Sequence, residues 1–306
     1  MVGYRGLLAS MLLVVTPPVA PPNIPSLVTP PEVAPTTLPA ARDIASRMTV
    51  GVFVNGQGPF AFAIDTGASR SVIARSLADR LALPIGRSAL MHGMAGQGMI
   101  DTVRIDRLGV GHTEVSGVDA PVIADGNLGV PGLLGIDGLA DQRIVMDFEK
   151  GMMRIEPSQR YEPLEANTIV VRGQRRFGQL ILADADVNGQ HLLVIVDSGS
   201  QVSIGNAALR ARLTHGGTDR FTGRTELQDV AGRKLSVDYG TLSQVRIGGI
   251  RILNVPIVFG DAHPFQMFGL SRQPAMLLGM DILRSFRKVS VDFGNKRVRF
   301  RANEIE

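Results

Sequence analysis

Residues 60–69 read FAFAIDTGAS, and residues 192–200 read LLVIVDSGS. Each stretch begins as a run of apolar, mostly strand-favouring residues and ends in an aspartate that is followed by a hydroxyl residue and a glycine. One such triplet is common in turns, but two triplets that close similar strands in one chain indicate an internal repeat. The two copies therefore predict two equivalent halves, with Asp65 and Asp197 at equivalent positions.

The repeat extends upstream of each aspartate. Residues 52–57 read VFVNGQ, and residues 185–190 read ADVNGQ. Asn-Gly between two β-rich runs is a strong hairpin signal, because both residues accept the positive φ angles of a two-residue turn. We therefore predict a hairpin immediately before each aspartate strand.

The repeat also continues downstream, with its elements in the same order. These are helical patterns at 74–83 and 206–213, glycine-bearing turns at 94–98 and 230–233, Leu-Leu-Gly elements at 132–137 (GLLGID) and 276–281 (MLLGMD), and starts of terminal hairpins at 143–148 (RIVMDF) and 288–293 (KVSVDF). The aspartates lie 132 residues apart and the Leu-Leu-Gly elements 144 residues apart, so the second half contains a longer insertion. We expect this insertion between the second helix and the second turn.

The repeated pattern predicts a mostly β fold, because short strands and glycines dominate both halves and helical patterns are few. A chain of 306 residues is long enough for two domains of ordinary size. We assign residues 1–40 to a signal-like segment and proline-rich tether, 41–158 to an N-terminal lobe and 159–306 to a C-terminal lobe. A connector between the lobes is expected around residues 156–180.

The N-terminus is typical of an export signal. Arg5 precedes an apolar stretch at residues 7–15, which is too short to span a bilayer. Nine of the 18 prolines then fall between Pro17 and Pro39, which favours a semi-extended tether. We expect export to the periplasm or cell envelope, with a membrane tether if the segment is not cleaved. The alternative is a cytosolic protein with a frayed, apolar N-terminus.

The composition excludes several classes of site. The chain has no cysteine, which rules out disulfides, thiolate nucleophiles and cysteine-based metal centres. Its five histidines form no i,i+4 pair, and neither a Walker phosphate-binding loop nor a nucleophile elbow is present. The net charge is only +4, and the short run at Arg172, Arg175 and Arg176 has no interleaved aromatic residues. We predict no metal, no cofactor and no nucleic-acid partner.

The two triplets and their Leu-Leu-Gly elements resemble the retropepsin-like and pepsin-like aspartic peptidases. The size of each half is similar to a retroviral protomer, and the fusion of two halves is similar to pepsin. Retropepsin-like proteins that bacteria export share both features. The resemblance covers residues 48–300 and implies two homologous β-barrel lobes related by a pseudo-twofold axis. It also implies that the Leu-Leu-Gly elements pack under the aspartate loops and that the connector joins an inter-lobe sheet.

The resemblance implies an aspartic endopeptidase in which Asp65 and Asp197 share one proton and activate a water molecule. The hydroxyls of Thr66 and Ser198 would bond across the lobe interface, and Gly67 and Gly199 would let the backbone approach the carboxylates. A protein or peptide substrate would bind in an extended form beneath flap-like turns. The residues expected in these turns are Gly93, Met94, Ala95, Gly96, Val230, Ala231 and Gly232.

Several alternatives stay open. Neither flap-like turn carries the tyrosine of pepsin, which puts pepsin-like specificity in doubt rather than catalysis. We expect a monomer with pseudo-dimeric lobes, because both aspartates lie in one chain; a homodimeric peptidase is the alternative. A non-catalytic, peptide-binding pseudo-protease at the cell envelope is a further alternative, although neither triplet is eroded.

Overall fold

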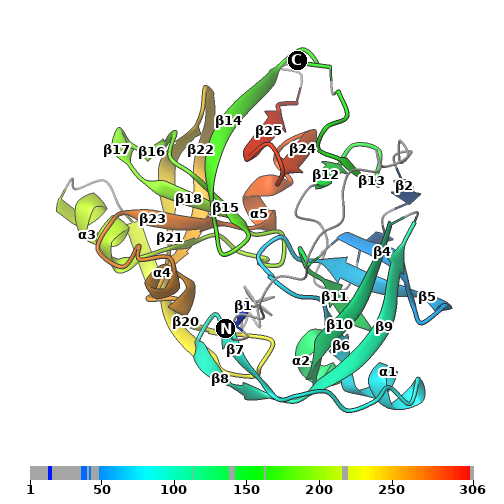
Figure 1. Cartoon of the computed structure of the whole chain (residues 1–306). Helices are drawn as coiled ribbons and strands as arrows, with labels where there is room; N and C mark the ends of the chain where they lie inside the picture. Colours follow the sequence, from blue (N-terminus) through cyan, green and yellow to red (C-terminus); the bar gives the residue numbers. More distant parts are fainter. Residues whose placement is uncertain are drawn as a thin grey trace, which may run out of the picture.

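The computed structural model describes residues 13–15, 36–39, 41–42, 48–111, 113–137, 142–161, 163–215 and 220–303. Most of the expected signal-like segment and tether therefore lies outside the described residues. Within these ranges, no helix is both long and apolar enough to cross a membrane. The described chain is mostly β, as the sequence predicts, and forms two lobes joined by a shared sheet (Figure 1).

The first lobe is a closed barrel of six strands. In barrel order these are β4 (Met48–Val54), β5 (Gln57–Ile64), β11 (Gly132–Leu134), β6 (Val72–Ala74), β10 (Thr113–Ile123) and β9 (Thr102–Val110), and β9 pairs again with β4. The short strand β3 (Ala41–Arg42) adds to β4, and the helices α1 (Arg75–Arg80) and α2 (Asp125–Leu128) follow β6 and β10. In β4, Val50, Val52 and Val54 are buried because alternate residues of a strand face the barrel interior.

The predicted Asn-Gly hairpins are present in both lobes. Asn55 and Gly56 join β4 to β5 with φ angles of 51° and 79°. Asn188 and Gly189 join β16 (Ala185–Val187) to β17 (Gln190–His191) with φ angles of 50° and 80°. Positive φ at both central residues gives a turn whose twist matches that of the paired strands. The chain then runs through β5, or through β18 (Leu193–Val196), into an aspartate.

The second lobe repeats the arrangement of the first. Its strands, in the order of the sheet, are β17, β16, β21 (Lys234–Ile247), β22 (Ile250–Phe259), β19 (Ile204–Gly205), β23 (Ala275–Leu278), β18 and β15 (Gln179–Leu182). β23 is parallel to β18 and antiparallel to β19, just as β11 is parallel to β5 and antiparallel to β6. The helices α3 (Ala207–His215) and α5 (Met280–Leu283) follow β19 and β23.

Only part of the longer insertion in the second lobe lies where we expected it. We expected it between the second helix and the second glycine-bearing turn. The largest difference instead lies between β22 and β23, where residues 260–274, including α4 (His263–Met267), take the place of the shorter segment 124–131 of the first lobe. The prediction was therefore right only in part: β20 and β21 form a longer hairpin than β7 and β8, but more of the extra chain lies in the surface segment between β22 and β23, where added residues leave the strand register unchanged.

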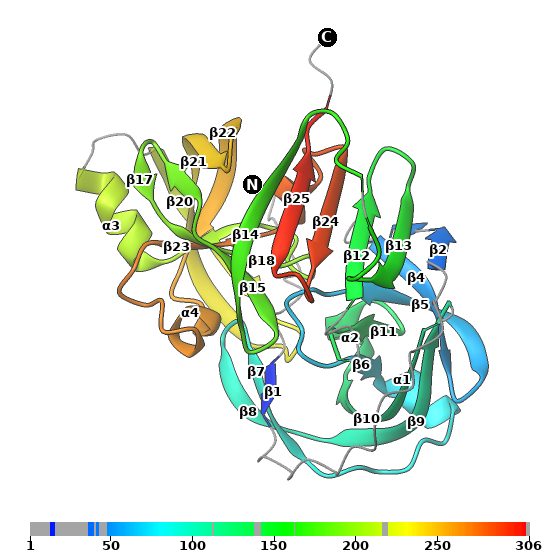
Figure 2. The same cartoon turned by 45° about the horizontal axis from the view of Figure 1, so that its top comes forward.

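The terminal hairpins of the two lobes pair with each other in a shared sheet (Figure 2). Its strands, in order, are β14 (Thr168–Arg176), β25 (Arg297–Arg301), β24 (Lys288–Asp292), β12 (Gln142–Asp147), β13 (Met152–Pro157) and β2 (Thr36–Pro39). β14 belongs to the connector, so the expectation that the connector joins an inter-lobe sheet is confirmed. Residues 142–157, which we assigned to the N-terminal lobe, also lie in this shared sheet.

Ion pairs join the two lobes within the shared sheet, and the repeat explains their positions. RIVMDF and KVSVDF each carry a cation at the first position and an aspartate at the fifth. Because β12 and β24 pair antiparallel, Arg143 lies opposite Asp292 and Asp147 lies opposite Lys288. Nitrogen–oxygen distances are 3.6 Å for the first pair and 4.0 Å for the second.

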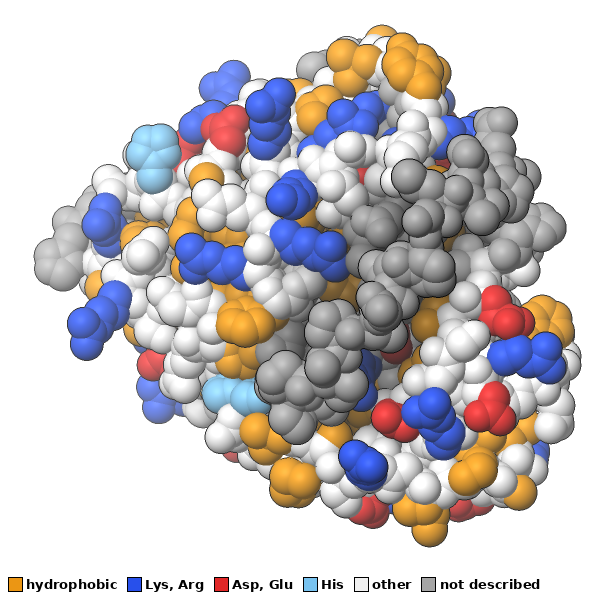
Figure 3. All heavy atoms as spheres, in the orientation of Figure 1, with side chains coloured by type: hydrophobic (Ala, Val, Ile, Leu, Met, Phe, Trp, Pro, Cys, Tyr) orange, Lys and Arg blue, Asp and Glu red, His pale blue; other side chains and the backbone are white. Residues whose placement is uncertain are grey.

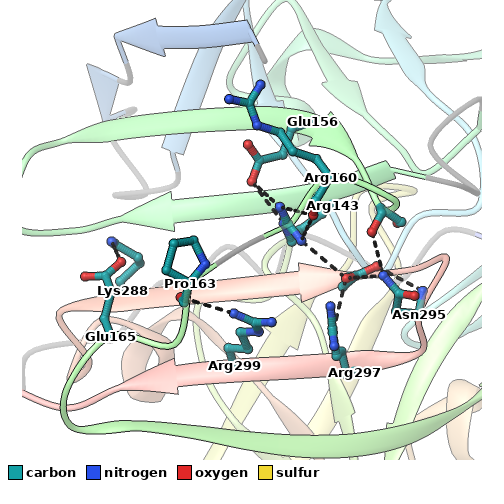
Figure 4. Close-up of polar contacts among 11 residues, drawn as sticks. Arg143, Glu156, Arg160, Pro163, Glu165, Lys288, Asn295, Arg297 and Arg299 are labelled. Atoms are coloured by element: carbon teal, nitrogen blue, oxygen red, sulfur yellow. Dashed lines mark hydrogen bonds and ion pairs between the residues drawn. The ribbon is translucent and has the colours of Figure 1, made fainter. Parts of the chain in front are cut away.

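The Arg143 guanidinium is buried in a polar network at this junction (Figure 4). Its Nε and Nη2 atoms donate to Oε1 of Glu156 over 2.9 Å and 2.7 Å, and it also donates to the Arg160 carbonyl. Burial alone would raise the pKa of Asp292, but hydrogen bonds from Asn295 and the nearby Arg297 guanidinium bring that pKa below its ordinary value. The sheet junction therefore holds a buried cation between carboxylates.

Apolar side chains fill the interior of both lobes and continue into the shared sheet. One cluster includes Phe62 of the first lobe, Leu278 of the second and Val291 of the shared sheet. On the face shown in Figure 3, Lys and Arg side chains are scattered over both lobes.

Candidate active site

Asp65 and Asp197 lie at equivalent points of the two lobes, directly after β5 and β18. The Leu-Leu strands β11 and β23 run parallel beside them. The Asp65 N–H donates to the Leu134 carbonyl over 3.0 Å, and the Asp197 N–H donates to the Leu278 carbonyl over 3.0 Å. The Leu-Leu-Gly elements therefore pack against the aspartate loops and fix their backbone.

A second pair of aspartates holds the base of each loop. Ser71 donates its N–H and its hydroxyl to Asp137 over 2.9 Å and 2.8 Å, and Ser203 does the same to Asp281 over 2.8 Å and 2.6 Å. Each serine hydroxyl accepts the N–H of its Leu-Leu-Gly glycine, over 3.1 Å and 2.9 Å. Burial raises the pKa of both aspartates. Sequence reasoning aligned them but gave them no role; their matching place two residues after each Leu-Leu-Gly was the available signal.

The hydroxyl residues of the two triplets bond across the lobe interface. The Thr66 hydroxyl accepts the Ser198 N–H over 2.9 Å and donates to the Val196 carbonyl over 3.2 Å. The Ser198 hydroxyl accepts the Thr66 N–H over 3.0 Å and donates to the Ile64 carbonyl over 3.2 Å. These four hydrogen bonds follow a local twofold axis, and they hold the two aspartate loops together.

The two carboxyl groups meet beside this set of hydrogen bonds. Both side chains are fully buried. Oδ1 of Asp65 accepts the Gly67 N–H over 2.9 Å, and Oδ1 of Asp197 accepts the N–H groups of Gly199 and Ser200 over 2.9 Å and 3.2 Å. The two carboxyl groups also lie within hydrogen-bonding reach of each other. The structure thus brings together the two aspartates that the sequence singled out.

Glycine is required after each hydroxyl residue by this close approach. A Cβ atom at Gly67 would lie 2.4 Å from Oδ1 of Asp197, and a Cβ atom at Gly199 would lie 2.2 Å from the carboxyl carbon of Asp65. Neither distance can be accommodated without moving a carboxyl group. Each glycine therefore leaves room for the carboxyl of the opposite lobe.

Burial raises the pKa of Asp197 to about 6. Removal from water disfavours the charged carboxylate, and this effect outweighs the backbone N–H of Gly199, the Asp65 side chain and the N–H of Ser200, which all lower the pKa. The paired carboxyls can therefore retain a proton at a pH where an exposed aspartate is fully ionised.

Two family comparisons match one lobe each. Residues 50–141 match the gag-polyprotein putative aspartyl protease family, and residues 183–282 match the aspartyl protease family. The chain belongs to the two-lobed, retropepsin-like aspartyl proteases. No curated protein matches the chain closely enough to count as a relative. Each family match contains one of the two aspartates at the lobe interface, so the repeat is a tandem of aspartyl protease domains.

The flap-like turns of this aspartyl protease family member close two hairpins. The first joins β7 (Ala89–Gly93) to β8 (Gly96–Ile100), and the second joins β20 (Arg220–Gln228) to β21. Met94 and Val230 are fully buried. These two side chains therefore pack the hairpin tips and are not offered to an open cleft.

Gln179 is a site residue that sequence reasoning missed. Its side chain is fully buried in β15, and its amide donates a hydrogen bond to the Gly67 carbonyl. The contact therefore links β15, in the second lobe, to the first-lobe triplet that contains Asp65. No motif marks Gln179, and the contact depends on how the lobes pack.

In the described part of the chain, no group of three or more His, Cys, Asp and Glu side chains is arranged to hold a metal ion.

Replacing Thr66 by valine should destabilise the protein by about 1–3 kcal/mol, because valine keeps the shape of threonine but leaves the buried Ser198 N–H and Val196 carbonyl without their partner. Urea unfolding of T66V and the native protein measures this loss. T241V, on an exposed position of β21, is the matched control and should change the unfolding free energy by less than about 0.5 kcal/mol. Equal effects of the two substitutions would contradict the importance of the cross-lobe bonds.

Proposed function

We propose that the protein is an aspartic endopeptidase whose catalytic dyad is Asp65 and Asp197. The observation that carries this proposal is the meeting of two fully buried carboxyl groups, one from each lobe, within hydrogen-bonding reach of each other. Two carboxylates this close do not readily ionise together, so the pair shares one proton. A general base and a general acid are then present at one point.

The dyad would act on a water molecule that lies against the peptide carbonyl. The ionised carboxylate accepts a proton from the water while the water oxygen bonds to the carbonyl carbon, and the protonated carboxyl donates its proton to the carbonyl oxygen. One hydroxyl of the resulting gem-diol then returns a proton to the dyad, the dyad protonates the amide nitrogen, and the C–N bond breaks. The dyad ends with the one proton it began with. Its two titrations belong to the pair, so neither aspartate has a fixed role as acid or base.

An extended peptide is the substrate form that the flap supports. The chain's own segment β1 (Leu13–Val15) pairs antiparallel with β7, with Leu13 opposite His92 and Val15 opposite Leu90. This edge of the flap hairpin therefore has backbone groups placed for an added strand. A substrate bound in this way is held by main-chain hydrogen bonds, with its alternate side chains available for recognition.

We further propose that the protein acts as a monomer outside the cytoplasm. Both carboxyls of the dyad come from one chain, so a single chain supplies a complete site. The signal-like segment in residues 1–20 supports a periplasmic or envelope location, with protein or peptide substrates present there.

The rate of peptide cleavage should fall as the pH rises through about 6. The pKa of Asp197 is raised to about 6 by burial, so the dyad loses its remaining proton, and with it the general acid, above that pH. The same shift affects stability: the contribution of Asp197 is fully present below its ordinary pKa of 3.8 and is lost as the pH rises through about 6. A profile of kcat/KM from pH 4 to 8 checks the first effect; a flat profile between pH 5 and 8 would contradict a proton shared by the dyad.

The test of the proposed function is cleavage of a peptide library by the full chain from pH 3 to 8, with products identified by mass spectrometry. Cleavage inside extended peptides, at a restricted set of sites, is the expected result. If no peptide is cleaved at any pH but some bind, the protein is instead a peptide-binding pseudo-protease.

A further inference from the structure

The turn of the second-lobe hairpin, residues 229–233, contacts the flap of the first lobe directly. Oδ2 of Asp229 accepts the N–H of Ala95 at the flap tip over 3.2 Å. A Cβ atom at Gly93 would lie 2.5 Å from the same oxygen. The carboxylate therefore sits against the flap backbone at a distance that only a glycine at position 93 permits.

The two oxygens of Asp229 have different partners. Oδ1 accepts the N–H groups of Ala231 and Arg233 over 3.0 Å and 2.9 Å, which closes its own turn. Oδ2 is directed to the other lobe, toward Ala95. The Asp229 side chain is almost fully buried, with 1% of its surface exposed, so both sets of bonds are shielded from water.

This contact is part of a wider exchange in which each hairpin tip docks on the opposite lobe. Met94 packs into an apolar cluster with Phe265 and other second-lobe residues, and its carbonyl accepts the His263 N–H of α4 over 2.8 Å. In return, Gln228 of the second hairpin donates to the Asn127 side chain of α2 over 3.0 Å. Figure 1 shows β7 and β8 next to α4 and β20.

A histidine pair strengthens the docking of the flap. Nδ1 of His92, on β7, lies 2.9 Å from Nε2 of His263, on α4. Burial, and then the neighbouring His263, lower the pKa of His92, which favours the neutral ring that such a hydrogen bond needs. The flap is therefore attached to the second lobe at two places. Its tip is held by Asp229 and by the His263 N–H, and its first strand, β7, is held by the contact between the His92 and His263 rings.

We infer that Asp229 is a positioning residue, which holds the first-lobe flap in its closed position through the Ala95 N–H and thereby sets how firmly an extended peptide is held beneath it. The effect on peptides rests on the proposed function, whereas the effect on the flap does not. A peptide can enter only when the flap leaves the second lobe, so the bond from Asp229 biases the equilibrium between open and closed flap.

The substitution D229N separates this role from folding of the turn. Asparagine retains one carbonyl oxygen, and its NH2 group cannot accept the N–H of Ala95. Two backbone amides face Oδ1 and only one faces Oδ2, so the carbonyl oxygen should stay on the side of the turn. The matched control is E226Q, which makes the same chemical change at an exposed position of β20, where Glu226 pairs with Lys234.

The experiment is hydrogen–deuterium exchange of the full chain without substrate, followed in peptides covering 89–100 and, for comparison, 288–301. In D229N the flap amides should exchange about 10-fold to 100-fold faster than in the native protein, the range expected for loss of a hydrogen bond to a charged group. Exchange at 288–301 should not change, and E226Q should behave as the native protein does. For cleavage of a peptide, D229N should lower kcat/KM about tenfold, mainly through a higher KM.

Unchanged flap exchange in D229N would overturn the inference, and so would faster exchange in both segments, because that result reports general loosening. If the native protein cleaves no peptide, the proposed function fails. The exchange experiment, which needs no substrate, still decides whether Asp229 holds the flap.

Discussion

D65N and D197N should each lower kcat for peptide cleavage by about 10³-fold or more. An asparagine can neither accept a proton from water nor share a proton with its partner, so each substitution removes the base and the acid together. Asparagine preserves the shape of the side chain, and Oδ1 can still accept the N–H groups that hold each aspartate. The loss should therefore appear in kcat with little change in folding, as measured by initial rates at pH 5 and by thermal unfolding.

The double variant gives the sharper result. If the two carboxyls act as one unit, D65N/D197N should be no slower than either single variant, because each single change already disables the pair. D106N, at an exposed position of β9, is the matched control and should cleave at the native rate. Activity that survives in one single variant would show that the two aspartates do not form a shared dyad.

R143M should destabilise the protein by about 3–5 kcal/mol, the range observed when one partner of a buried ion pair is removed. Methionine fills much of the volume but leaves the buried carboxylates of Glu156 and Asp292 without the Arg143 guanidinium, while Asp292 keeps its ion pair with Arg297. Because these groups join β12 to β13 and to β24, the loss should weaken the attachment of the lobes as well as each hairpin. Urea unfolding at pH 7 measures the change in free energy.

The exposed pair Arg104–Asp119 provides the comparison. Its nitrogen–oxygen distance is 3.3 Å, and its side chains are 48% and 38% exposed. R104M should therefore cost less than about 1 kcal/mol, because water solvates both charges when the pair is broken. Equal losses of unfolding free energy in R104M and R143M would contradict the argument that burial of the junction makes Arg143 important. Partial recovery of stability in R143M at low pH would support the argument, since protonation removes carboxylate charge that Arg143 no longer balances.

Much of the candidate site could be predicted from the sequence because its elements are local and occur twice. Asn-Gly specifies a turn through its own φ angles, and each Asp triplet follows directly on a strand. The Leu-Leu-Gly elements could be paired with the triplets because their order is the same in both halves. Asp65 and Asp197 were identified by this repetition, since one triplet alone would have been an ordinary turn.

Other features depend on contacts between residues that no local pattern connects. Gln179 reaches Gly67 only because the second lobe packs against the first. The repeat suggested flap-like turns, but it did not show that the two tips contact each other through Asp229 and Ala95. The larger part of the insertion was misplaced for a related reason: matching motifs fix the order of elements, whereas the structure decides which surface segment contains most of the extra chain.

The sequence by itself determined the duplicated β architecture, the hairpins before the aspartates and the identity of the two candidate catalytic residues. These follow from backbone preferences and strand periodicity, which act over a few residues, together with repetition along the chain. The tertiary structure alone decided that the two carboxyls meet in a buried, shared environment, that Arg143 lies between carboxylates at the sheet junction, and that each hairpin tip docks on the opposite lobe. Burial and inter-lobe distance depend on the packing of segments more than a hundred residues apart, and no local preference encodes them.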